Sequence, residues 1–126
     1  MTEPPPDELV EIAHHVFDLA RAGDHVRLAA YVDAGVPADL TDASGNTLLM
    51  LAAYHGHADA VRTLVARGAD VDRLNDRGQS PLAGAVFKAE NAVVGVLLES
   101  GADLDAGQPS ARATAMLFGR EDLLGG

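Results

Sequence analysis

The side chains best suited to hold a metal ion are five histidines: His14, His15, His25, His55 and His57. His14 and His15 are adjacent, and adjacent side chains on a helix point about 100° apart, so this pair cannot readily share one ion. His55 and His57 flank a glycine at a predicted turn, and no third ligand follows at zinc-binding spacing. We therefore expect no metal site and no cofactor.

Two pairs of aspartates could serve general acid–base catalysis, namely Asp70 with Asp72 and Asp103 with Asp105. A catalytic pair should occur once, in a pocket that gives its two carboxyl groups unequal environments. These pairs instead recur along the chain, which is typical of aspartates that accept hydrogen bonds from backbone N–H groups in loops. We expect these carboxylates to be structural, and we expect no catalytic residues.

Other catalytic signatures are missing from the sequence. It has no cysteine, and no Gly-x-x-x-x-Gly-Lys-Ser/Thr, Gly-x-Ser-x-Gly or His-Glu-x-x-His run. Thiol nucleophiles, disulfides and cysteine zinc sites are thereby excluded, and phosphate loops and serine hydrolase elbows are not indicated. We expect the chain not to be an enzyme.

The net charge limits the classes of molecule that the chain can bind. The chain has 9 Lys+Arg against 19 Asp+Glu, a formal net charge of -10, and only 4% aromatic residues. Nucleic acid would be repelled and would find few rings for base stacking. No apolar run approaches the roughly 18 residues that span a bilayer, and the acidic, proline-containing start is unlike a signal peptide. We expect a cytoplasmic protein whose partner has a basic patch.

The elements that must position these side chains form an internal repeat. Shifting the sequence by 33 residues superposes identical residues in one register: Gly45 on Gly78, Leu49 on Leu82, Ala52 on Ala85, Leu64 on Leu97, Gly68-Ala69-Asp70 on Gly101-Ala102-Asp103, and Asp72 on Asp105. Each period predicts a short apolar helix, a turn, a second helix and a loop. In the clearest copy, the first helix begins after Thr47, Gly56 ends it, and a second helix covers about 59–67.

The chain resembles an ankyrin-repeat protein over about residues 42–106. The resemblance rests on Gly45, the Thr47-Leu48-Leu49 and Ser80-Pro81-Leu82 helix starts, Gly56-His57, and the two Gly-Ala-Asp closings. It implies an all-α solenoid of about four helix-turn-helix units. It also implies that His57 bonds backbone groups between helices.

The sequence departs from the family pattern at five positions. Leu48 replaces a proline, Met50 and Ala83 replace a histidine, and Ala89-Glu90 replaces Gly-His. We expect somewhat weaker local rigidity where the histidine is missing, a less certain turn at Ala89, and the same fold.

We expect one domain, because 126 residues suit a single core. A disordered leader is predicted at 1–6 and the repeat domain at 7–126, divided into a capping repeat (7–41), two full repeats (42–74 and 75–107) and a truncated repeat (108–126). Asp7 and Ser110 are the predicted helix N-caps of the two flanking units.

The resemblance also implies where a partner binds. Ankyrin proteins use their hairpin tips and the inner face of each first helix. Transferred by position, this surface comprises Ala43, Ser44, Asn46, Tyr54, His55, Asp76, Arg77, Gln79, Phe87 and Lys88. Tyr54 and Phe87 are equivalent in successive repeats, and large aromatic residues are typical of binding hot spots.

We therefore predict a protein–protein interaction module. The alternative is an accessory or regulatory subunit of one enzyme, such as a catalase-associated ankyrin protein. We expect a monomer, and a contact between two copies through the apolar stretch 116–118 remains open.

Overall fold

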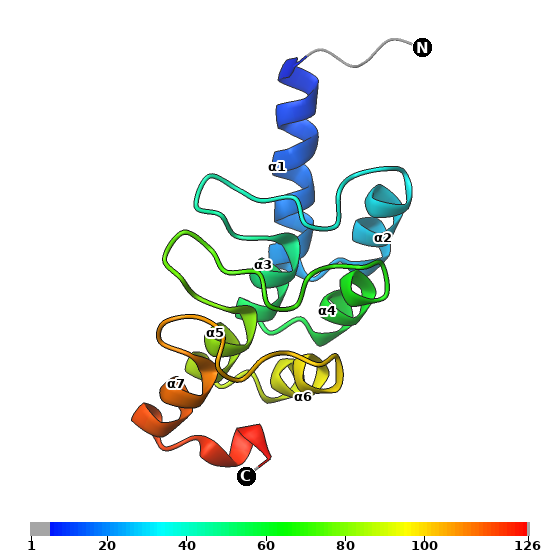
Figure 1. Cartoon of the computed structure of the whole chain (residues 1–126). Coiled ribbons are helices and arrows are strands. Elements are labelled where there is room, and N and C mark those ends of the chain that lie inside the picture. The colour runs from blue at the N-terminus through cyan, green and yellow to red at the C-terminus, as the bar shows by residue number, and fades with distance from the viewer. Residues whose placement is uncertain (1–5, 126) are drawn as a thin grey trace.

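The computed structural model describes residues 6–125, and its regular structure is helical throughout that range (Figure 1). Most of the predicted leader (1–6) lies outside the described residues. The elements are α1 (Pro6–Ala22), α2 (His25–Asp33), α3 (Leu48–Tyr54), α4 (Ala58–Val65), α5 (Pro81–Phe87), α6 (Asn91–Glu99), α7 (Ala111–Phe118) and the 3-10 helix η1 (Glu121–Leu124). One isolated bridge pairs Thr41 with Thr47 across a hairpin. The expectation of an all-α fold is confirmed.

The helices form two parallel columns, and in each column they are stacked in the order in which they occur along the chain. The first helices of the units, α1, α3, α5 and α7, stack in one column, and α2, α4 and α6 stack in a second column beside it (Figure 1). In the last unit, η1 takes the place of a second helix and packs on both α6 and α7. This arrangement is the predicted solenoid of about four helix-turn-helix units, in which each unit buries its apolar face against its neighbours.

Hydroxyl side chains start three of the four first helices. The Oγ1 of Thr47 accepts a hydrogen bond from the Met50 N–H at 3.0 Å, and the Oγ of Ser80 accepts one from the Ala83 N–H at 3.0 Å. Ser110 caps α7 in the same way, as predicted. The prediction for Asp7 was wrong, because α1 already begins at Pro6. Asp7 therefore lies in the first turn, where its charge favours the helix dipole.

The two central first helices carry the core. Residues 48–53 of α3 and 81–86 of α5 are all buried. Helices this short are not stable alone, so they depend on neighbours on every side. The alanines Ala52, Ala53 and Ala85 are wholly or almost wholly inaccessible and let adjacent helices approach closely.

The turns between paired helices need a residue with positive φ. Gly56 supplies φ 81°, and Ala89 adopts φ 56° at the equivalent place in the next unit. The next residue makes the same backbone hydrogen bond in both turns. The His57 N–H donates to the Ala52 carbonyl, and the Glu90 N–H donates to the Ala85 carbonyl, both at 2.9 Å. The family departure at Ala89 thus leaves the turn unchanged in form.

The recurring aspartates join successive loops. The Asp39 carboxylate accepts a hydrogen bond from the Asp70 N–H at 2.9 Å, and Asp72 accepts one from the Asp103 N–H at 2.8 Å. Asp70 and Asp103 accept hydrogen bonds from the N–H groups of Asp72 and Asp105, so the expected backbone-bonding role is confirmed for Asp70, Asp72 and Asp103. Asp105 instead accepts a hydrogen bond from the Arg112 side chain.

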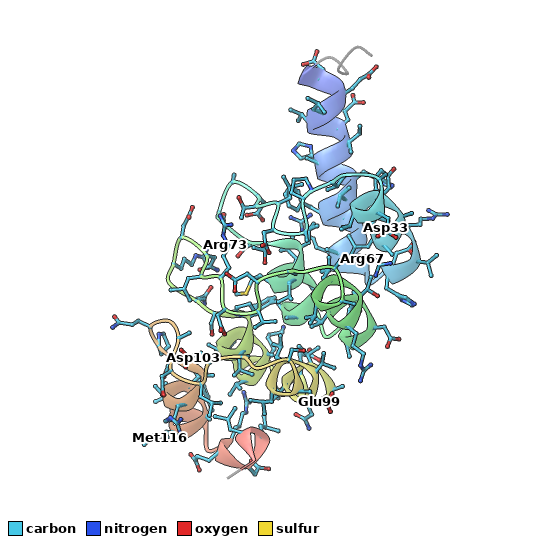
Figure 2. The ribbon with its side chains drawn as sticks, turned by 45° about the vertical axis from the view of Figure 1, so that its right-hand side comes forward. Asp33, Arg67, Arg73, Glu99, Asp103 and Met116 are labelled. Carbon is cyan, nitrogen blue, oxygen red and sulfur yellow. The ribbon has the colours of Figure 1, made fainter. Side chains whose placement is uncertain are left out.

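In the second column, Arg67 makes a two-pronged ion pair with Asp33 of the preceding unit (Figure 2). This pairing lowers the pKa of Asp33. Within residues 6–125, no helix is long and apolar enough to cross a membrane.

Candidate functional site

The hairpin tips lock onto one another through Asn75. Its Nδ2 donates to the Oδ1 of Asn46 in the preceding hairpin and to the Oε1 of Gln79 in its own, both at 2.9 Å. Its Oδ1 accepts from the backbone N–H groups of Arg77 and Gln79. The Asp76 N–H also donates to the Ser44 carbonyl at 3.0 Å. The predicted tip residues therefore lie on hairpins that are hydrogen-bonded to each other.

A small hollow lies between these tips and the inner helices. It encloses about 200 Å³ and is lined by Ser44, Asn46, Met50, Leu51, Tyr54, Asn75, Arg77 and Gln79. Five of the ten predicted contact residues line it. Polar tips and an apolar helix wall thus share one surface, which suits a protein contact with mixed chemistry.

An apolar groove continues from this hollow towards the C-terminus. It encloses about 280 Å³ and is lined by Tyr54, Gln79, Ala83, Gly84, Phe87, Pro109, Thr114, Leu117 and Phe118. Tyr54 and Gln79 border both hollows, so the two form a continuous face along α3, α5 and α7. We call the second hollow the α5–α7 groove.

Tyr54 and Phe87 project from equivalent positions of α3 and α5 and are 36% and 49% exposed. The Phe87 ring meets Phe118 of α7 edge-on, with 5.4 Å between ring centroids. The sequence analysis considered Leu117 and Phe118 only for a contact between two copies and did not place them on this face. The sequence contains a signal for their position. The last unit starts three residues earlier than the 33-residue period requires, and with this shift Leu117 is equivalent to Tyr54 and Phe87.

Four predicted contact residues lie outside the lining of both hollows: Ala43, His55, Asp76 and Lys88. Lys88 nevertheless reaches the face, since its ammonium lies 5.1 Å from the centroid of the Tyr54 ring. Burial lowers the pKa of His55, and the positive charges of His57, Arg21 and Lys88 lower it further, against an opposing effect of Glu90. The lowered pKa favours the neutral form of His55.

The histidines have no common ligand site. In residues 6–125, no group of three or more His, Asp or Glu side chains is placed to hold a metal ion. The Nε2 of His57 lies 2.7 Å from the Arg21 carbonyl oxygen. A carbonyl oxygen only accepts hydrogen bonds, so this ring nitrogen carries the proton. His57 thus bonds the backbone of the preceding unit, as the resemblance implied.

The comparisons with known proteins agree with this architecture. The family model of ankyrin repeats in three copies matches residues 17–108, and the chain belongs to this family. An ankyrin repeat protein of Pseudomonas aeruginosa is 48% identical over 66 residues, which cover 49% of this chain and 39% of that protein.

Two further relatives come from distant organisms. An ankyrin repeat-containing protein of Treponema pallidum is 38% identical over 94 residues, covering 73% of this chain and 32% of that protein. Human ankyrin repeat domain-containing protein 29 is 45% identical over 62 residues, covering 48% of this chain and 21% of that protein. The matches cover less than half of each relative's length. Ankyrin repeats are generally protein-interaction modules.

Proposed function

We propose that this chain binds a protein partner on the face formed by the hairpin tips and by helices α3, α5 and α7. The observation that carries the proposal is the pair Tyr54 and Phe87. These rings occupy equivalent positions and are half-exposed, and both line the α5–α7 groove. Aromatic anchors on a rigid scaffold bind with little loss of conformational entropy, which favours a tight contact.

The test is affinity capture from the native cell extract with the wild-type chain and with a Tyr54→Ala/Phe87→Ala variant. We expect the double variant to lose the captured protein while its helical circular dichroism and melting temperature stay nearly unchanged. Val26→Ala is the matched control, because Val26 is an exposed apolar residue on α2 in the other column.

Two outcomes would contradict the proposal. Equal capture by wild type and double variant would place the binding face elsewhere. Unfolding of the double variant, checked with each single variant, would assign the rings to the core. An accessory role for one enzyme would use the same face, so the identity of the captured protein decides between that role and a general interaction module.

Net charge adds an expectation about the partner. The chain carries a formal charge of -10, which acts at long range on any approaching protein. A partner with a basic patch near its contact surface would associate faster for this reason. We expect the association rate to fall as salt rises, and a rate independent of ionic strength would contradict this part of the proposal.

A further inference from the structure

The α5–α7 groove exists because small residues form its floor. Gly84 of α5 stands at the position that Leu51 occupies in α3 and Thr114 in α7, so no large side chain fills the space. A methyl group on Gly84 would meet its nearest neighbours, the Met50 Cε and the Tyr54 Cδ2, at 3.4 and 3.6 Å. The floor is therefore close to the backbone, and the walls are the rings of Tyr54, Phe87 and Phe118.

The size of the groove limits what it can hold. Pockets for drug-sized ligands enclose about 300–1,000 Å³ and bury most of the ligand. At about 280 Å³, with exposed walls, the groove accommodates one or two apolar side chains of a larger molecule. Leu117 and Phe118 are 76% and 46% exposed, so a covering segment would remove a continuous apolar surface from water.

The groove is bordered by cations in a chain that is strongly acidic. Five basic residues form ion pairs with aspartates: Arg21, Arg27, Arg62, Arg67 and Arg112. The other four, Arg73, Arg77, Lys88 and Arg120, have no carboxylate of the described chain within 4.0 Å, and two of these, Lys88 and Arg120, lie at the groove. Lys88 lies over the ring of Tyr54, and the Arg120 guanidinium lies 5.2 Å from the centroid of Phe118.

Arg120 is also fixed in place. Its NH1 donates to the carbonyl oxygens of Val86 and Phe87 at the end of α5. Those carbonyls are the negative end of the helix dipole, so they hold the guanidinium beside the groove without neutralising its charge. The Glu90 carboxylate, in contrast, lies against Gly56 at the α3–α4 turn. A preorganised positive charge therefore lies beside Phe87 and Phe118, two of the residues that line the groove.

We propose that the α5–α7 groove binds a partner-protein segment that combines large apolar side chains with carboxylates. The apolar side chains fill the space over Gly84, and the carboxylates meet Lys88 and Arg120 in charge-assisted hydrogen bonds. The proposal rests on the proposed function and specifies the chemistry of the bound segment. It is compatible with a basic patch elsewhere on the same partner, because the net charge acts at long range and the two cations act at contact.

The test uses the ¹⁵N-labelled chain and three short synthetic peptides. The peptides share the same leucine and phenylalanine positions and carry glutamate, serine or lysine at all others. We expect the glutamate peptide to shift the backbone amide signals of Gly84, Phe87 and Leu117. We expect it to bind about fivefold more tightly than the serine peptide, and the lysine peptide to bind most weakly.

A charge reversal supplies the matched control. Lys88→Glu should abolish the preference for the glutamate peptide. Arg73→Glu makes the same change of charge at an exposed arginine that does not line the groove, and it should leave the preference intact (Figure 2). Circular dichroism of both variants checks that the fold is retained.

Four results would overturn the proposal: equal affinity for the glutamate and lysine peptides, shifts that map outside the groove, no shift with any peptide, or self-association. The last concerns a second copy, because Leu9, Val10 and Ile12 of α1 are exposed beside Glu8 and Glu11. Concentration-dependent shifts of both α1 and the groove, without peptide, would identify that occupant. If capture depends on Tyr54 and Phe87 but the peptides show no charge preference, the proposed function stands and this inference fails.

Discussion

At the scale of single residues, Ala89 is the clearest site of backbone strain. It adopts φ 56°, a left-handed conformation in which a Cβ atom is crowded by the backbone. Glycine has no Cβ and adopts this conformation without that cost. Ala89→Gly should therefore stabilise the protein by about 1 kcal/mol, measured by urea denaturation. Ala92→Gly is the control, since Ala92 is exposed in α6 with ordinary helical geometry, and it should destabilise by roughly 0.5–1 kcal/mol. If both changes destabilise, the strain at Ala89 is not significant.

His55 should make stability depend on pH. Its pKa is lowered in the folded chain, chiefly by burial and then by nearby positive charges, so the unfolded chain binds the proton more readily. Its contribution to the free energy of unfolding is complete above the unfolded-state pKa of about 6.5, and this contribution is lost as the pH falls below that value. The urea midpoint of wild type should therefore drop more between pH 7.5 and 5.5 than that of His55→Gln. Equal drops would contradict the assignment.

The 33-residue period predicted the structural role of the recurring aspartates, and the resemblance to ankyrin repeats implied the role of His57. The role of Arg120 could not be predicted in this way. Its guanidinium reaches the carbonyls of Val86 and Phe87, which precede it by more than 30 residues. Arg120 lies three residues out of the 33-residue register, so the period does not align it with His57.

At the scale of helices, one position decides how each turn contacts the preceding unit. His57 donates to the Arg21 carbonyl, and Arg120 donates to the Phe87 carbonyl at the equivalent place. Between them stands Glu90, whose carboxylate packs on Gly56 as the His57 ring packs on Gly23. An ionised carboxylate has no proton to donate to a carbonyl, so this interface lacks the side-chain bond that the other two have.

Glu90→His should therefore stabilise the chain by about 1 kcal/mol by supplying the missing donor. Glu99→His controls for the removal of one negative charge, because Glu99 is an exposed residue of α6 (Figure 2). The comparison is made from urea midpoints at pH 7.5. A gain no larger than that of the control would attribute the effect to net charge and not to the hydrogen bond.

The order and type of the helices were predictable, since glycines, hydroxyl caps and apolar stretches mark them in each period. The α5–α7 groove was not, because it depends on a register shift between units. Tyr54 and Phe87 were found by the 33-residue period, whereas Leu117 and Phe118 fall three residues early and are not aligned by it. Gly84, the small residue at the floor of the groove, does not by itself indicate a groove in the sequence. It forms one only because aromatic rings stand around it in the structure.

At the scale of the whole molecule, stability should decrease from the centre to both ends. Helices α3 and α5 are buried between neighbours on either side, whereas α7 buries only Ala111, Thr114 and Ala115 and leaves Met116 at the end of the stack 67% exposed (Figure 2). Repeat solenoids gain stability from each interface, so a unit with one interface opens first.

Native-state hydrogen exchange measures this gradient directly. Backbone amides of α3 and α5 should exchange only through global unfolding, and those of α7 at least about tenfold faster. The first turns of α1, where residues 7–12 are exposed, should exchange as fast as α7. Uniform protection along the chain would contradict the gradient and would mean that the four units unfold as one. With the gradient present, a segment bound in the α5–α7 groove should slow exchange in α7 most, because it would give the terminal unit the second interface that it lacks.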